Sequence, residues 1–87
     1  MCGIVASCGP EPRSLSQELV RHLAALEYRG YDSAGVASVS RSGIHLVKSV
    51  GPVNVLGNRL RTMRVPEAAV GLAHKRWATH GAVTESN

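Results

Sequence analysis

The chain has 87 residues, with 10 Lys and Arg against 6 Asp and Glu and a formal net charge of +4. This length allows at most one small domain. One Trp and two Tyr are too few for a base-stacking platform, and the basic residues are scattered, so we expect no nucleic-acid partner. No apolar run reaches membrane-spanning length and no leader precedes Cys2, so we expect a cytoplasmic protein without a membrane partner.

The chain opens Met1-Cys2-Gly3, and removal of Met1 would leave Cys2 with a free α-amine. An α-amine titrates near pH ~8, so part of it is unprotonated at neutral pH and can accept the thiol proton. A cysteine attacks as its thiolate, and an N-terminal cysteine would thus carry both nucleophile and base. The alternative is a small buried hydrophobe at the start of a strand.

The remaining ligand-type residues indicate no metal site. Cys2 and Cys8 are too few for a disulfide framework and are not spaced as a Cys-x-x-Cys pair. No two of the four histidines stand four residues apart, as a zinc-binding pair on a helix would. We therefore expect no metal and no other cofactor.

The first half of the chain predicts a strand and a helix. Ile4–Ser7 has strand character, and residues 9–12, Gly-Pro-Glu-Pro, predict a turn that cannot continue it. Ser14 with Gln17 matches a capping box at a helix start, and Gly30 is the predicted stop. The buried face of this helix is a row of leucines: Leu15, Leu19, Leu23 and Leu26.

The second half predicts a hairpin, a helix and a buried strand. Ala34–Ser40 and Ile44–Val50 are β-branched-rich runs separated by a three-residue loop, residues 41–43. A helix follows Pro52 and ends by Pro66, with its apolar positions at Val53, Leu56, Leu60 and Met63. Ala68–His74 is short and apolar, as a buried strand would be.

Two corners carry polar side chains that can serve a site. In residues 26–35 the helix turns into the next strand, and Arg29 and Asp32 lie there as either site residues or an exposed ion pair. In residues 76–81, Arg76 offers a planar fork that matches an α-carboxylate, and Thr79 and nearby amides offer further donors. An amino acid is therefore the substrate that these groups suit. The alternative is that Trp77 anchors the core, His80 is a satisfied polar residue and Arg76 a solvated charge.

Together, the Cys2 start and residues 26–35 and 76–81 resemble the class II glutamine amidotransferases, whose glutaminase domain is an N-terminal-nucleophile hydrolase. Within that class, the sequences of residues 26–35 and 76–81 are similar to the fructose-6-phosphate branch. The phosphoribosyl-diphosphate branch is the second candidate. The resemblance runs over residues 1–87 and is weakest between Arg41 and Pro66.

The resemblance implies roles for particular residues. Cys2 would attack the side-chain amide of L-glutamine, giving a γ-glutamyl thioester and ammonia, with its own α-amine as base. Arg76 would bind the α-carboxylate of glutamine, and Thr79 and His80 would line the pocket. Trp77 would lie on a loop that closes over the substrate, and Arg29 would orient Cys2 or favour its thiolate.

The resemblance also sets what we expect of fold and completeness. It implies an α+β chain that forms the incomplete N-terminal part of a four-layer αββα sandwich, with strands in both sheets, part of one helical layer, and exposed sheet edges and apolar faces. The Asn-Gly oxyanion pair and the amine-binding aspartate of the family lie downstream of its match to residues 76–81, as do the sugar-isomerase domains that bind the sugar phosphate acceptor. We therefore expect a glutaminase-domain fragment of a homodimeric parent, inactive alone, or a non-catalytic binding or regulatory module.

Overall fold

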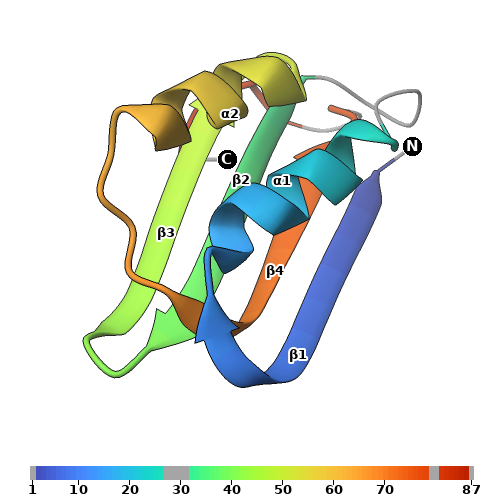
Figure 1. Cartoon of the computed structure of the whole chain (residues 1–87). Helices are drawn as coiled ribbons and strands as arrows, with labels where there is room; N and C mark the ends of the chain where they lie inside the picture. The colour runs from blue at the N-terminus through green and yellow to red at the C-terminus, as the bar shows by residue number, and fades with distance from the viewer. Residues whose placement is uncertain (1, 27–31, 79–80, 87) are drawn as a thin grey trace.

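The computed structural model describes residues 2–26, 32–78 and 81–86. In chain order the elements are β1 (Gly3–Arg13), α1 (Leu15–Ala24), β2 (Ser33–Ser40), β3 (Gly43–Val50), α2 (Val53–Arg61) and β4 (Ala68–Arg76). The strands form one antiparallel sheet in the order β1-β4-β2-β3, and both helices lie over the same face of it (Figure 1). The α+β class is confirmed. The expected division of the strands between two sheets is wrong, because β4 pairs with both β1 and β2.

The core lies between the two helices and one face of the sheet. Side chains alternate between the faces of a strand, so Val36 of β2, Val47 of β3 and Ala73 of β4 all point toward the helices. Fully buried leucines of the two helices pack against these side chains: Leu15, Leu19, Leu23, Leu56 and Leu60. Burial of each leucine is worth roughly 1.5–3 kcal/mol, so this layer supplies most of the driving force for folding.

The opposite face of the sheet, the outer face, is apolar and exposed. Its large exposed side chains come from all four strands: Ile4, Val39, Ile44, Leu46, Val50, Val70 and Leu72. Ile4 and Ile44, which are 67% and 75% exposed, show how open it is. The expected exposure of apolar sheet surface is therefore confirmed. Among the described residues, neither helix has the length and apolarity needed to cross a membrane.

β1 is longer than the sequence indicates. The predicted end of the strand at Ser7 is wrong, because pairing with β4 continues through Cys8 and resumes at Arg13, opposite Ala68. Residues 9–12 bulge between these two pairs. The two prolines of the bulge lack N–H groups, but a bulge on an edge strand needs no ladder donors there.

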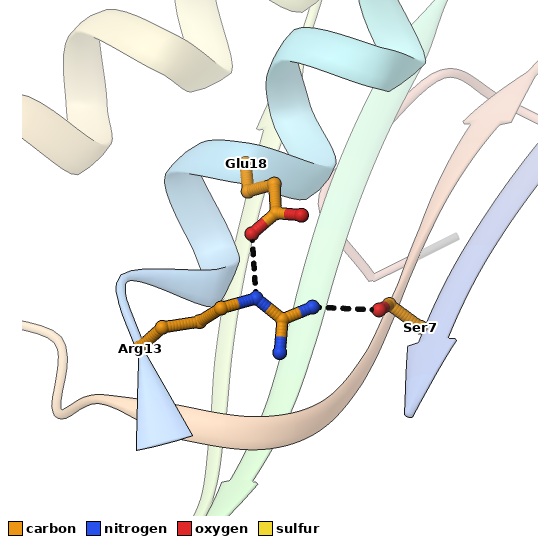
Figure 2. Close-up of polar contacts among 3 residues, drawn as sticks. All are labelled: Ser7, Arg13 and Glu18. Carbon is orange, nitrogen blue, oxygen red and sulfur yellow. Dashed lines mark hydrogen bonds and ion pairs between the residues drawn. The ribbon is translucent and has the colours of Figure 1, made fainter. Parts of the chain in front are cut away.

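Arg13 fixes the bulge to the start of α1 (Figure 2). Its Nε donates to Glu18 Oε2 at 2.7 Å, and its Nη2 donates to Ser7 Oγ at 2.8 Å. The predicted capping box is wrong, since the Ser14 side chain makes no capping hydrogen bond. Glu18 in the first turn supplies the negative charge that a helix N-terminus favours. The guanidinium of Arg13 donates to the Glu18 carboxylate and holds its pKa below its usual range.

The hairpin and α2 depart from prediction only at their ends. Ser40 pairs with Gly43, so the hairpin loop has two residues rather than three, and Gly43 opens β3 with a φ of 116° that favours glycine. α2 ends at Arg61, so Met63 lies beyond the helix and is exposed rather than buried. α1 likewise ends at Ala24, and the predicted stop at Gly30 lies outside the described residues.

Two glycines should respond oppositely to alanine. At Gly71 of β4 a Cβ would meet the Ala37 carbonyl oxygen at 2.7 Å and Leu15 and Leu19 at 3.1 Å, so Gly71→Ala should destabilise the chain by about 1–3 kcal/mol. At Gly57 inside α2 the nearest atom, from Val20, is at 3.6 Å, so Gly57→Ala should stabilise it by roughly 0.5–1 kcal/mol. Urea denaturation of both variants measures the two signs, and destabilisation by Gly57→Ala would contradict the packing of α2.

The Arg13–Glu18 pair should make stability depend on acid pH. Because the folded state lowers the pKa of Glu18 from 4.5, the ionised carboxylate stabilises the fold above pH 4.5, and this contribution is lost as the pH falls through the lowered value. Glu18→Gln should therefore lower the melting temperature at pH 7, and the gap to the unmodified chain should shrink below pH 4.5. The exposed Glu67→Gln serves as the control for loss of one charge, and a gap that stays constant with pH would refute the role of the pair.

Candidate functional site

The candidate site lies at one end of the sheet, where two strands begin and two strands end. Because all neighbours are antiparallel, the start of β1, the start of β2, the end of β4 and the end of β3 share this end (Figure 1). The register places Gly3 opposite Lys75 and Ser33 opposite Arg76. Residues from both ends of the chain therefore meet here.

Cys2 is a free, exposed thiol directly before β1. The backbone N–H of Trp77 donates to Cys2 Sγ at 3.4 Å, which links the first described residue to the segment after β4. The interpretation of Cys2 as a buried hydrophobe is wrong, and its exposure leaves the sulfur open to a reactant.

Arg76 is the last residue of β4 and its side chain is half-buried. Its Nη1 donates to the Ala82 carbonyl at 2.9 Å and its Nη2 donates to the Gly81 carbonyl at 3.2 Å. The fork thus addresses two neighbouring oxygens, which is the arrangement that a carboxylate also presents. In this conformation the two oxygens come from the chain itself.

Asp32 ties three segments together at this end of the sheet. Its Oδ2 accepts a hydrogen bond from the Ala78 N–H at 2.6 Å, and its backbone N–H donates to the Arg76 carbonyl at 3.2 Å. Its own carbonyl accepts from the Gly51 N–H at 2.8 Å. The Asp32 carboxylate thus accepts from backbone, while Arg29, its partner in the predicted exposed ion pair, lies outside the described residues.

Lys75 lies on the helix side of β4 and is fully buried. Its Nζ donates to the Leu26 carbonyl at 3.0 Å, just beyond the C-terminal end of α1. A cation is favourable at this pole of a helix, and the hydrogen bond offsets part of the cost of burying the charge. Lys75 thereby fastens the end of α1 to the strand that carries Arg76.

A cavity of about 190 Å³ opens beside Arg76 on the outer face. His74, Lys48 and Glu85 supply polar groups to its wall, and the rest is mainly apolar. Cys2 is not among the described residues that line it. The cavity is thus separate from the thiol. Elsewhere in residues 2–26, 32–78 and 81–86, no three His, Cys, Asp or Glu side chains come close enough to hold a metal ion.

The structure brings three of the predicted site residues to one end of the sheet. Cys2, Arg76 and Trp77 are adjacent there, and Trp77 is 45% exposed, so its interpretation as a core anchor is wrong. Arg29, Thr79 and His80 lie outside the described residues.

Sequence reasoning missed one contact and one residue at this end of the sheet. It did not identify the bond from the Asp32 carboxylate to Ala78 or the burial of Lys75. A signal for Lys75 exists in the alternation Gly71, Ala73, Lys75, which puts a charge on the helix side of the strand.

The whole chain is similar in sequence to known proteins. No family model matches it. Over all 87 residues it is 46% identical to a glutamine--fructose-6-phosphate aminotransferase (isomerizing) of Rhizobium leguminosarum bv. viciae and 46% identical to one of Gloeobacter violaceus. A protein of the same name from Pyrococcus horikoshii is 41% identical over the same length. The chain spans 14% of the length of each of these relatives. Identity at this level along its entire length shows that the chain belongs to the glutamine--fructose-6-phosphate aminotransferase family.

Proposed function

We propose that this chain is the N-terminal part, residues 1–87, of a glutaminase domain, and that the natural protein hydrolyses L-glutamine to supply ammonia for glucosamine 6-phosphate. The observation that carries the proposal is the exposed Cys2 thiol, which receives the Trp77 N–H beside Arg76. The names of the relatives favour fructose 6-phosphate as the acceptor over the phosphoribosyl-diphosphate alternative.

In the first half of the reaction, the free α-amine of Cys2 takes the thiol proton. The thiolate attacks the side-chain carbonyl carbon of glutamine, and the negative charge moves to the amide oxygen. Collapse of this intermediate breaks the C–N bond, and the α-ammonium returns the proton to the leaving nitrogen, which departs as ammonia. The acyl group is left on Cys2 as a γ-glutamyl thioester.

In the second half, water hydrolyses the thioester. The α-amine accepts a proton from the attacking water, the C–S bond breaks, and the proton passes to sulfur, which restores the thiol and releases glutamate. The Trp77 N–H supports this cycle because it donates to the sulfur that first attacks and later leaves.

Recognition of glutamine falls to Arg76 and its neighbours. The α-carboxylate would replace the carbonyls of Gly81 and Ala82 on the guanidinium fork, so binding exchanges two neutral acceptors for one charged one. Thr79 and His80 follow directly in the chain and would line the same pocket, Arg29 would orient Cys2, and the exposed Trp77 ring would cover the substrate and exclude water.

The self-base mechanism requires a mature N-terminus at Cys2. Intact-mass analysis of the natural protein at its full length should show loss of Met1 and no acetyl group. Insertion of one alanine before Cys2 keeps the thiol but moves the α-amine away, so glutaminase turnover should be lost while iodoacetamide still labels the thiol. Full turnover by the insertion variant would rule out the α-amine as the base.

Arg76→Lys tests recognition, because it keeps the charge and loses the fork. In the natural protein at its full length, KM for glutamine should rise by about 10- to 100-fold, which corresponds to a charge-assisted hydrogen-bond contribution of roughly 1.5–3 kcal/mol. Arg64→Lys, at an exposed position before β4, is the matched control and should leave KM unchanged. An unchanged KM in Arg76→Lys would remove Arg76 from the pocket.

A further inference from the structure

The segment after β4 is held in place from two sides by Asp32. Its backbone N–H donates to the Arg76 carbonyl at 3.2 Å, and its carboxylate Oδ2 accepts from the Ala78 N–H at 2.6 Å. Trp77 lies between these two bonds, and its N–H is the one that points at Cys2 Sγ. The orientation of that N–H is therefore set by the peptide groups on either side of it.

Asp32 can serve as an anchor because its own position is fixed. It directly precedes β2, and its carbonyl accepts from the Gly51 N–H at 2.8 Å, directly after β3. Asp32 is half-buried, so the bond to Ala78 is partly shielded from competing water. A short bond to an ionised acceptor is among the stronger hydrogen bonds in proteins.

We propose that Asp32 is a positioning residue for the thiol chemistry. It holds residues 76–78 so that the Trp77 N–H faces Cys2 Sγ and the Arg76 side chain extends from β4 toward the glutamine. The inference rests on the proposed glutaminase function. In this role Asp32 contacts neither the Cys2 sulfur nor the substrate. It acts through the backbone of Trp77 and Ala78. A merely structural aspartate would affect stability and leave the chemistry of the folded protein unchanged.

The experiment compares Asp32→Asn with Asp32→Ala in the natural protein at its full length. Both variants remove the charge, but only asparagine keeps an oxygen that can accept from Ala78, so their difference isolates the hydrogen bond. Glu67→Ala, at an exposed position, controls for loss of one carboxylate. Two quantities are measured: the rate of Cys2 alkylation by iodoacetamide at a fixed pH, and kcat and KM for glutamine. Alkylation is followed on the Cys2 peptide by mass spectrometry, because Cys8 is exposed as well.

The Asp32→Ala variant should be alkylated at Cys2 several-fold more slowly than the Asp32→Asn variant, since its sulfur lacks an oriented donor. Its kcat/KM for glutamine should fall by about 10²-fold, a loss typical of small misplacements in an active site, and asparagine should restore most of it. Equal alkylation rates and equal kcat/KM in the two variants would overturn the proposal, whether both match the unmodified protein or both fall together.

Two further results keep the inference separate from folding and from the proposed function. In the unmodified protein the Ala78 amide should exchange its hydrogen at least tenfold more slowly than in an unstructured peptide of the same sequence, and exchange at the peptide rate would overturn the proposal without any variant. If the unmodified protein lacks glutaminase activity, the proposed function fails, while the alkylation rate of Cys2 still decides the role of Asp32.

Discussion

The pairing of β4 with β1 on one side and β2 on the other is the constraint that the site depends on. It places Gly3 opposite Lys75 and Ser33 opposite Arg76, so residues from the two ends of the chain meet at one end of the sheet. A slip of one residue would exchange the faces of β4 and carry Arg76 to the helix side. The buried ammonium of Lys75, bonded to the Leu26 carbonyl, opposes that slip because its charge would lose its partner.

Contacts between side chains and backbone groups organise the site around this frame. Trp77 N–H meets Cys2 Sγ, Ala78 N–H meets the Asp32 carboxylate, and the Arg76 fork is occupied by carbonyls. Such contacts depend on where the chain runs after β4 and hardly on which side chains it carries there. A rigid strand that ends at a fixed point is therefore what gives the thiol a defined neighbour.

The elements of this fold were largely predictable because their signals are local. Leucine spacing gave α1, and β-branched runs gave the hairpin, with errors of a few residues at the ends. The bulge in β1 was missed, since the two prolines read as a stop and only pairing with Ala68 brings Arg13 back into the strand. Cys2, Trp77 and Arg76 were identified from their motifs, but the link from Asp32 to Ala78 spans 46 positions and follows from strand order, which no local pattern encodes.

The bulge at residues 9–12 separates two parts of β1 that would otherwise have to follow one continuous register with β4. The ladder from Gly3 to Cys8 sets the register at the thiol, and Arg13 with Glu18 sets where α1 begins. Only one residue of β4, Ala69, stands opposite these four residues between the paired positions. The bulge thus takes up the difference in length between β1 and β4, so both registers are kept in one strand.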